Sequence, residues 1–274
     1  MRNNLAEIFR FLLKIPLFRN RYFTFHKHLF HPYQIFSGVK KQIVYRNDIK
    51  IKVHLDDWIQ QQIFFLGEYE KPEIDYLYET LKPGNVFVDV GANIGLFSLN
   101  ASKIVGLEGK VYAFEAFMPN YVKLYDNIKI NNYTNIVAEN NAILNQNSTI
   151  EILYNESDKN VGMASTYLKN FTSKELVEGL SLDHYFNDKM IEKVDLIKID
   201  IEGGEYNALL GMDRILSELK PKVLIEINQV ALENSGHNEN EIIEFFKKYN
   251  YKILKKLSMN SQSYNAVFGF SVHE

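Results

Sequence analysis

From residue 86 to the C-terminus, short apolar segments with the length of β-strands alternate with helical patterns, and this alternation constrains the fold more than any other feature. Strands that alternate with helices pair in parallel and are covered on both faces. The last two strands are too close together for a helical crossover, so they should form an antiparallel hairpin at one edge. The sequence therefore predicts an α/β fold with a doubly wound, mostly parallel seven-stranded sheet. Its strands are expected at residues 86–90, 111–115, 135–139, 194–200, 222–227, 251–255 and 264–272.

The first 80 residues do not follow this alternation. Two short apolar runs, at 41–45 and 49–55, flank a polar turn and predict a β-hairpin. A helical stripe that includes Ile74 and Leu77 then leads into the main domain. We therefore expect three parts, which are a helical extension over residues 1–36, a hairpin with a lead-in helix over 37–80, and the main domain over 81–274.

The extension over residues 1–36 is basic and has two open interpretations. Leu5, Ile8, Phe9 and Leu12 recur at helical spacing and predict one apolar face. Six basic residues stand against one acidic residue in the first 30, although the chain carries a net charge of −3. Such a helix can pack on the main domain or on a second copy of the chain, or it can lie on an anionic membrane surface.

Several classes of site and segment are excluded by composition. The chain has no cysteine, which rules out disulfides, thiolate zinc sites and a cysteine nucleophile. Arg10, Lys14 and Pro16 interrupt the N-terminal apolar stretch, which argues against a secretory signal. No apolar run reaches the ~18 residues that a membrane span needs. We expect a cytoplasmic protein, either free or held at the membrane surface by its extension.

The stretch VFVDVGANIGLFSL, residues 86–99, runs from an apolar strand through two glycines into a helix. A glycine-rich turn of this kind lets a nucleotide-like ligand approach the backbone. The dinucleotide fingerprint would need glycines at 91, 93 and 96, and only the first is present, which argues against a nicotinamide enzyme. Asn93 replaces a glycine at low cost, because asparagine tolerates positive φ. The expected cofactor-binding residues here are Asp89, Gly91, Ala92, Asn93 and Gly95.

Two further strand ends complete the predicted nucleotide site. Glu115 ends the second strand, where a carboxylate can accept both hydrogen bonds of a ribose diol. The third strand ends at Asn140, Asn141 and Ala142, beside the expected position of the adenine. Of these we select Asn141 and Ala142 as cofactor-binding residues.

The stretch KIDIEGGEYNALLG, from Lys198 to Gly211, places three carboxylates where a buried strand meets a glycine pair. Ligands in open α/β sheets lie outside the carboxyl ends of the strands, so Asp200 and Glu202 are expected to face the reaction. Lys198 lies within the buried strand and needs a carboxylate partner, for which we expect Glu226. Glu205 falls in the first turn of the next helix, where it should stabilise the helix dipole by ~0.3–1 kcal/mol.

Four motifs together, VDVGANIG, AFEAFMPN, SLDHYF and IKIDIEGGEYNALLG, resemble the FkbM family of S-adenosylmethionine-dependent methyltransferases over roughly residues 65–257. The family usually has proline after the acidic residue of the second strand, whereas Ala116 follows Glu115 here. The resemblance implies a Rossmann-like class I methyltransferase fold, S-adenosyl-L-methionine as cofactor and O-methylation of a hydroxyl on a sugar, glycan or related small molecule.

The predicted chemistry is removal of a hydroxyl proton and in-line transfer of a methyl group. Asp200 or Glu202 is the expected base, with its pKa raised by crowding and burial, and Lys198 completes the catalytic set. A rival mechanism uses Mg²⁺ on Asp200, Glu226 and Asn228, although we favour no metal. The acceptor is expected at the loop Asn155 to Thr172, with His184 and His237 as weaker candidates.

The sequence leaves three other functions to be considered. The chain could methylate a lipid-linked glycan at a membrane, or bind the cofactor without catalysis. A nucleic-acid methyltransferase is disfavoured because the usual [Asn/Asp]-Pro-Pro-aromatic run is replaced by Asp-Ile-Glu-Gly, and because the acidic body offers no phosphate track. We expect no nucleic-acid partner.

Overall fold

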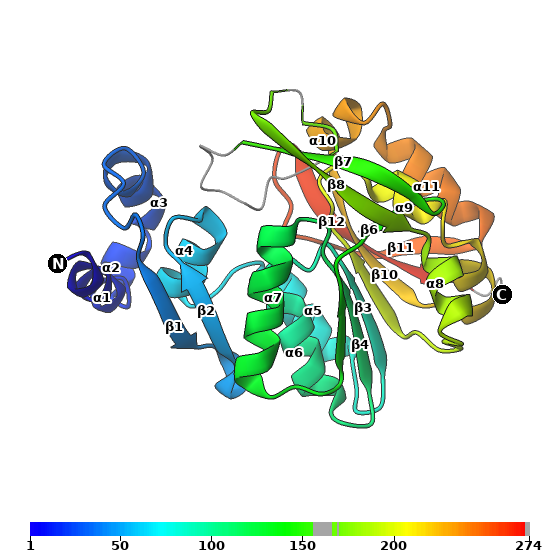
Figure 1. Cartoon of the computed structure of the whole chain (residues 1–274), viewed down its shortest axis with the longest axis horizontal. Helices are drawn as coiled ribbons and strands as arrows, with labels where there is room; N and C mark the ends of the chain where they lie inside the picture. The colour runs from blue at the N-terminus through cyan, green and yellow to red at the C-terminus, as the bar shows by residue number, and fades with distance from the viewer. Residues whose placement is uncertain (156–165, 169, 272–274) are drawn as a thin grey trace. The chain divides into compact units, whose positions relative to one another are not determined.

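A computed structural model of the chain describes residues 1–155, 166–168 and 170–271 (Figure 1). The described residues divide into two compact units, one formed by Met1–Lys71 and the other by the described residues from Pro72 onward. Within the second unit, Glu73 accepts a hydrogen bond from Asn265 Nδ2 at 3.0 Å, which ties the lead-in helix to the last strand. The boundaries expected at 36/37 and 80/81 stay a prediction about domains.

The first unit consists of short helices and one hairpin. Its hairpin is antiparallel, with Lys40 opposite His54, which confirms the expected pair of strands. Aromatic side chains form its core, and the ring centroids of Phe30 and Phe36 lie 4.9 Å apart. The elements are α1 (Arg2–Leu12), α2 (Pro16–Arg19), α3 (Tyr22–Phe25), the π-helical turn η1 (His26–Phe30), β1 (Lys40–Val44), the 3-10 turn η2 (Arg46–Asp48), β2 (Lys50–His54) and α4 (Trp58–Leu66).

Helix α1 packs with only part of its predicted apolar face. Ala6 and Leu13 are fully buried, and Phe9 packs edge-to-face on Phe30 at 5.0 Å. Ile8, by contrast, is 55% exposed, so one of the four residues of the predicted apolar face is not packed within the first unit. The reason is that the aromatic core packs against the side of the helix that carries Ala6 and Phe9. Ile8 lies away from this core.

The second unit is built on the expected seven-stranded sheet, with the order β11-β12-β10-β9-β3-β4-β5. Strands β10, β9, β3, β4 and β5 are parallel, and β12 is antiparallel to both β10 and β11. Chain order reverses between β9 and β3, which is the position where α/β sheets bind ligands. The strands are β3 (Val86–Val90), β4 (Lys110–Phe114), β5 (Ile136–Glu139), β9 (Leu196–Ile199), β10 (Lys222–Asn228), β11 (Tyr251–Leu257) and β12 (Ser263–Phe270).

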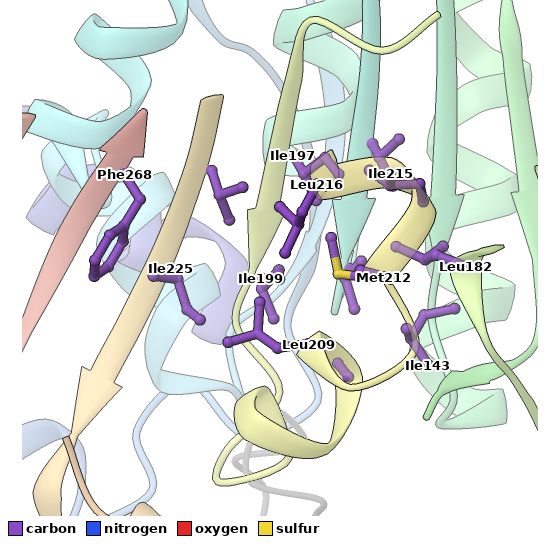
Figure 2. Packing of buried hydrophobic residues seen from close by; sticks show 14 of the residues in the cluster. Ile143, Leu182, Ile197, Ile199, Leu209, Met212, Ile215, Leu216, Ile225 and Phe268 are labelled. Atoms are coloured by element: carbon purple, nitrogen blue, oxygen red, sulfur yellow. The ribbon is translucent and has the colours of Figure 1, made fainter. Parts of the chain in front are cut away.

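Alternate side chains of the strands enter one large core. Ile197, Ile199 and Ile225 pack with Leu209 and Met212 in that core (Figure 2). The period of two along a strand leaves Lys198 on the opposite face, as predicted, with Nζ 4.6 Å from the ring centroid of Phe97. The helical elements of this unit are α5 (Lys71–Thr80), α6 (Leu96–Val105), α7 (Met118–Asn131), α8 (Leu182–Asp188), α9 (Glu205–Leu209), the π-helical turn η4 (Ile215–Leu219), α10 (Gln229–Asn234) and α11 (Glu239–Lys248).

A second, three-stranded sheet has no counterpart in the sequence prediction. It consists of β6 (Ala142–Ile143), β7 (Ser148–Tyr154) and β8 (Ser173–Leu180) in the order β6-β8-β7. Strands β7 and β8 form an antiparallel hairpin, with Tyr154 opposite Ser173. The expected acceptor loop, Asn155 to Thr172, therefore joins the two strands of this hairpin.

Candidate active site

The glycine loop leaves the carboxyl end of β3 at the reversal point of the sheet. Gly91, Asn93 and Gly95 have φ angles of 81°, 51° and 92°, so asparagine does occupy a left-handed position, as its substitution for glycine predicts. A Cβ on Gly91 would lie only 1.9 Å from the backbone oxygen of Asp200. The cofactor loop and the end of the carboxylate strand are thus in direct backbone contact.

Asp89 lies at the base of this loop and is fully buried. Ser98 Oγ donates a hydrogen bond to Asp89 Oδ2 at 2.5 Å, whereas Oδ1 has no hydrogen-bond partner among the described residues. Burial raises the pKa of the Asp89 carboxyl, and the neighbouring Lys198 opposes that rise. The orphaned oxygen is a polar group that a bound ligand can satisfy. Ser98 was missed by the sequence reasoning, although its place one turn into α6 is the available signal.

Glu115 follows β4 and holds the glycine loop from the other side. Its Oε2 accepts from the backbone N–H of Asn93 at 2.7 Å, and its Oε1 accepts from that of Phe117 at 3.0 Å. Burial raises the pKa of Glu115 to about 7, and the two backbone donors oppose that effect. An ionised carboxylate has about four lone-pair sites, so Glu115 keeps acceptor capacity for a diol.

The turn after Glu115 is held by an asparagine instead of by the usual proline. Asn140 Nδ2 donates to the backbone oxygens of Glu115 and Ala116 at 2.8 and 2.9 Å. Asn141, chosen from the sequence in place of Asn140, donates its Nδ2 to the Glu178 backbone oxygen at 3.1 Å, and Ala142 is buried in β6. Their contact with an adenine stays a prediction.

Lys198 and Asp200 form an ion pair at the end of β9, with Nζ and Oδ2 3.0 Å apart. The Lys198 side chain is 5% exposed and that of Asp200 25% exposed. Lys198 is also opposite Asp89 in the β3–β9 register, so it lies between two carboxylates. The ion pair seen here is with Asp200, two residues along the chain, and the expected pairing with Glu226 stays a prediction.

Glu202 has both an unusual backbone and an unusual ionisation. Its φ is 52°, a left-handed conformation that costs a non-glycine residue ~1–3 kcal/mol and is concentrated at functional sites. Burial, followed by the charges of Asp200 and Glu205, raises the pKa of Glu202 to about 8. A carboxylate with this pKa is matched to proton transfer near neutral pH.

Glu205 does more than stabilise a helix dipole. It does begin α9, as predicted, but it is buried, and its carboxylate accepts from the backbone N–H groups of Ile201 at 2.9 Å and of Gly203 at 3.0 Å. Burial raises its pKa to about 7. These bonds hold the turn that carries Glu202. Gly203 has a φ of 104°, and a Cβ there would lie 2.7 Å from the Ala231 backbone oxygen.

The β7–β8 hairpin contacts the beginning of α7. Tyr154 in β7 packs its ring on Phe117 at 4.9 Å, and Glu175 in β8 accepts from the backbone N–H of Met118 at 3.0 Å. Tyr167 lies close to the carboxylate turn, because its Cδ2 would be 3.4 Å from a Cβ on Gly203. The core of the expected acceptor loop, residues 160–165, lies outside the described residues.

The two candidate histidines have local partners. His184 Nε2 lies 3.2 Å from Asp188 Oδ2, within one helix. The His237 ring contacts that of Tyr206 in a tilted arrangement, with centroids 4.6 Å apart, and its Nδ1 lies 3.4 Å from Glu241 Oε1. Both contacts are ones that a structural histidine makes.

Within residues 1–155, 166–168 and 170–271, no group of three His, Cys, Asp or Glu side chains is arranged to hold a metal ion. Asn228, a ligand in the rival Mg²⁺ mechanism, caps α10 and accepts from the Ala231 N–H at 3.2 Å, and the rival mechanism stays a prediction. The chemistry that this site offers is carboxylate chemistry, in which a positively charged ligand is favoured and a proton can be removed.

Comparison with known proteins identifies relatives of this chain. Residues 89–253, more than half of the chain, match the Methyltransferase FkbM domain. The methyltransferase sdnD of Sordaria araneosa is 28% identical over 189 residues, which are 58% of this chain and 73% of that protein.

Similar solved structures include two methyltransferase structures and fibrillarin. FkbM methyltransferase of Methylobacillus flagellatus KT has a TM-score of 0.47 at 18% identity, covering 77% of this chain and 55% of that one. An S-adenosylmethionine-dependent methyltransferase of Aquifex aeolicus has a TM-score of 0.47 at 14% identity, covering 79% and 95%. Aeropyrum pernix fibrillarin with bound S-adenosyl-L-methionine has a TM-score of 0.46 at 14% identity, covering 73% and 74%.

Proposed function

Because the chain belongs to the FkbM family of S-adenosylmethionine-dependent methyltransferases, we propose that it O-methylates a hydroxyl of a sugar, a glycan or a related small metabolite. The observation that carries this proposal is Glu202, a strained carboxylate with a pKa of about 8 at the reversal point of the sheet. A hydroxyl acceptor needs a base of this kind, because it must lose its proton when the methyl group is transferred.

Several features of the residues expected to bind the cofactor support this part of the proposal. S-adenosylmethionine supplies an electrophilic methyl group on a positively charged sulfur when it is bound. The loop backbone at Gly91 approaches the Asp200 backbone closely, and Asp89 Oδ1 is an acceptor that still lacks a donor among the described residues. Glu115, held by two backbone N–H groups, presents a fixed carboxylate at the ribose position.

The proposed division of labour among the carboxylates follows from their partners. Asp200 is paired with Lys198, and in this position it can orient the acceptor hydroxyl or complement the positive sulfur. Glu202 has the raised pKa and accepts the hydroxyl proton. Glu205 is a positioning residue, because it holds the backbone of the turn on which Glu202 is placed. Orientation of the two bound partners supplies the rest of the rate enhancement.

The charge of the site supports a neutral acceptor that is rich in hydroxyl groups. Asp89, Asp200, Glu202 and Glu205 lie near one another, and their mutual influence on pKa values reflects this. Such a group disfavours phosphates and nucleic acids, whose charge it repels, and it offers acceptors to sugar hydroxyls. Tyr167, near the carboxylate turn, adds an aromatic surface on which a sugar ring can pack.

The test is methyl transfer from isotopically labelled S-adenosylmethionine to fractionated glycans and metabolites, with the product identified by mass spectrometry. Glu202→Gln should bind the cofactor with unchanged affinity by calorimetry but lose at least ~100-fold in turnover, as general-base removal does. Glu108→Gln, on the exposed surface, is the matched control and should be fully active. Full turnover by Glu202→Gln would remove Glu202 as the base, and products labelled on nitrogen would overturn O-methylation.

A further inference from the structure

Helix α1 of the first unit is apolar on two sides, and only one of them is packed. The packed side contains the fully buried Ala6 and Leu13, together with Phe9, whose ring contacts Phe30 at 5.0 Å and Phe36 at 5.9 Å. The packed side of this helix therefore already has its partners within the first unit. Any other apolar side chain on α1 must be explained by a different environment.

Four large apolar side chains lie on the surface of the same segment. Ile8 and Phe11 are 55% and 69% exposed and are three residues apart, which places them on one side of the helix. Ile15 and Leu17 follow directly after α1 and are 42% and 64% exposed. We call these four residues the outer apolar face. Single exposed apolar residues are common, but a cluster within ten residues marks an interaction site.

Every Asp, Glu, Lys or Arg between residues 8 and 27, the segment that carries the outer apolar face, is a Lys or an Arg. Lys14 lies between Phe11 and Ile15, and Arg21 and Lys27 follow, all exposed to solvent. In the part of the chain that the structure describes, none of these three has an ion-pair partner. The other cations of this segment have local roles: Arg2 donates to the Ser37 backbone oxygen at 2.9 Å, and Arg19 pairs with Glu68.

We propose that the outer apolar face and its three unpaired cations bind the surface of an anionic lipid bilayer. Apolar side chains enter the boundary between headgroups and acyl chains while Lys14, Arg21 and Lys27 contact anionic headgroups, the arrangement by which interfacial helices bind. No helix within the described ranges is long and apolar enough to cross a membrane, so binding is at the surface.

A second copy of this chain fits the outer apolar face less well than an anionic membrane does. Contact of the outer apolar face with itself would bring together two segments that each carry six basic residues and one acidic residue. Like charges brought together at an interface oppose association, whereas an anionic surface complements them. The proposal is independent of the acceptor, because it concerns only residues of the first unit.

The test is flotation of the full chain with vesicles of phosphatidylcholine alone or with one third phosphatidylserine. The wild-type chain should float with the anionic vesicles, and its bound fraction should fall strongly in 1 M salt, where screening is within ~3 Å. The double variant Phe11→Glu, Leu17→Glu should reduce the partition coefficient at least ~10-fold, since each buried aromatic or aliphatic side chain contributes that much. Lys14→Gln with Arg21→Gln should weaken binding to anionic vesicles by a similar factor.

Leu107→Glu with Met190→Glu is the matched control, because both residues are more than 80% exposed in the second unit. This control should float as the wild type does, and circular dichroism should show that all variants are folded. Equal binding to both kinds of vesicle, equal loss in the control, or no binding at all would overturn the proposal. So would a dimer in sedimentation velocity that Phe11→Glu, Leu17→Glu converts to a monomer, since that result assigns the face to a second copy.

Discussion

The contact between Gly91 and the end of β9 leads to a sharp prediction for Gly91→Ala. The new Cβ would lie 1.9 Å from the Asp200 backbone oxygen and 3.0 Å from Ile201 Cγ2. The Asp200 oxygen is a backbone atom and cannot move away cheaply, so the carboxylate turn itself must shift. The φ of Gly91, +81°, adds a conformational cost.

Gly84→Ala provides the matched control. Gly84 has a φ of +80°, and a Cβ there meets nothing within 4 Å. The left-handed conformation should cost both variants ~1–2 kcal/mol of unfolding free energy. Overpacking should cost Gly91→Ala a further ~1–3 kcal/mol that Gly84→Ala does not lose. The difference between the variants therefore isolates the contact between loop and strand.

Two measurements test this reasoning. Urea denaturation followed by far-ultraviolet circular dichroism should give a midpoint for Gly91→Ala clearly below that of Gly84→Ala. Transfer from labelled S-adenosylmethionine should be at least ~10-fold slower in Gly91→Ala and unchanged in Gly84→Ala, because misplacement of a reacting group by about 1 Å can cost 100-fold. Equal destabilisation of the two variants, or full activity of Gly91→Ala, would refute the proposed contact.

Two further predictions concern the charges of the site. The pKa of Glu202, about 8 against 4.5 in the unfolded chain, means that the folded state binds more protons between these values, so stability should fall as pH rises through this window. Urea titrations from pH 5 to 8.5 should show this slope in the wild type. Glu202→Gln should reduce the slope to the part that Glu115 and Glu205 contribute, each with a pKa of about 7, and an unchanged slope would place the proton elsewhere. Lys198→Met should lower the unfolding free energy at pH 7 by ~3–5 kcal/mol, because Asp89 and Asp200 lose their buried counter-charge. Adding Asp89→Asn should recover part of that loss, and a double variant as unstable as Lys198→Met would show that Asp89 is not coupled to it.

The local sequence pattern was sufficient to predict the strands of the main sheet and the conformation of the glycine loop. Each of the seven strands lies within a few residues of its predicted position, and the hairpin of β1 and β2 is antiparallel as expected. The left-handed conformation of Asn93 also follows from residue type alone. These features depend on side-chain periodicity and on allowed φ and ψ angles, which are properties of a residue and its near neighbours.

The small sheet of β6, β7 and β8 could not be predicted in the same way. Its strands are short or largely exposed, so they lack a continuous apolar run. Their pairing is also decided by contacts between residues that are distant in sequence, such as Ala142 with Gly179. The hydrogen bonds of Asn140 to the turn after Glu115 could not be predicted for the same reason, because they depend on how two strand ends meet.

The carboxylates of the stretch KIDIEGGE show most clearly what the sequence determines and what the tertiary structure determines. Sequence alone determined that a buried strand delivers acidic residues to the carboxyl edge of a parallel sheet, because strand parity and fold class do not depend on the details of packing. Tertiary structure decided that Asp200 pairs with Lys198, that Glu202 has a pKa of about 8, and that Glu205 binds the backbone of the turn. Burial and distance set these properties, and both arise only when distant segments of the chain pack together.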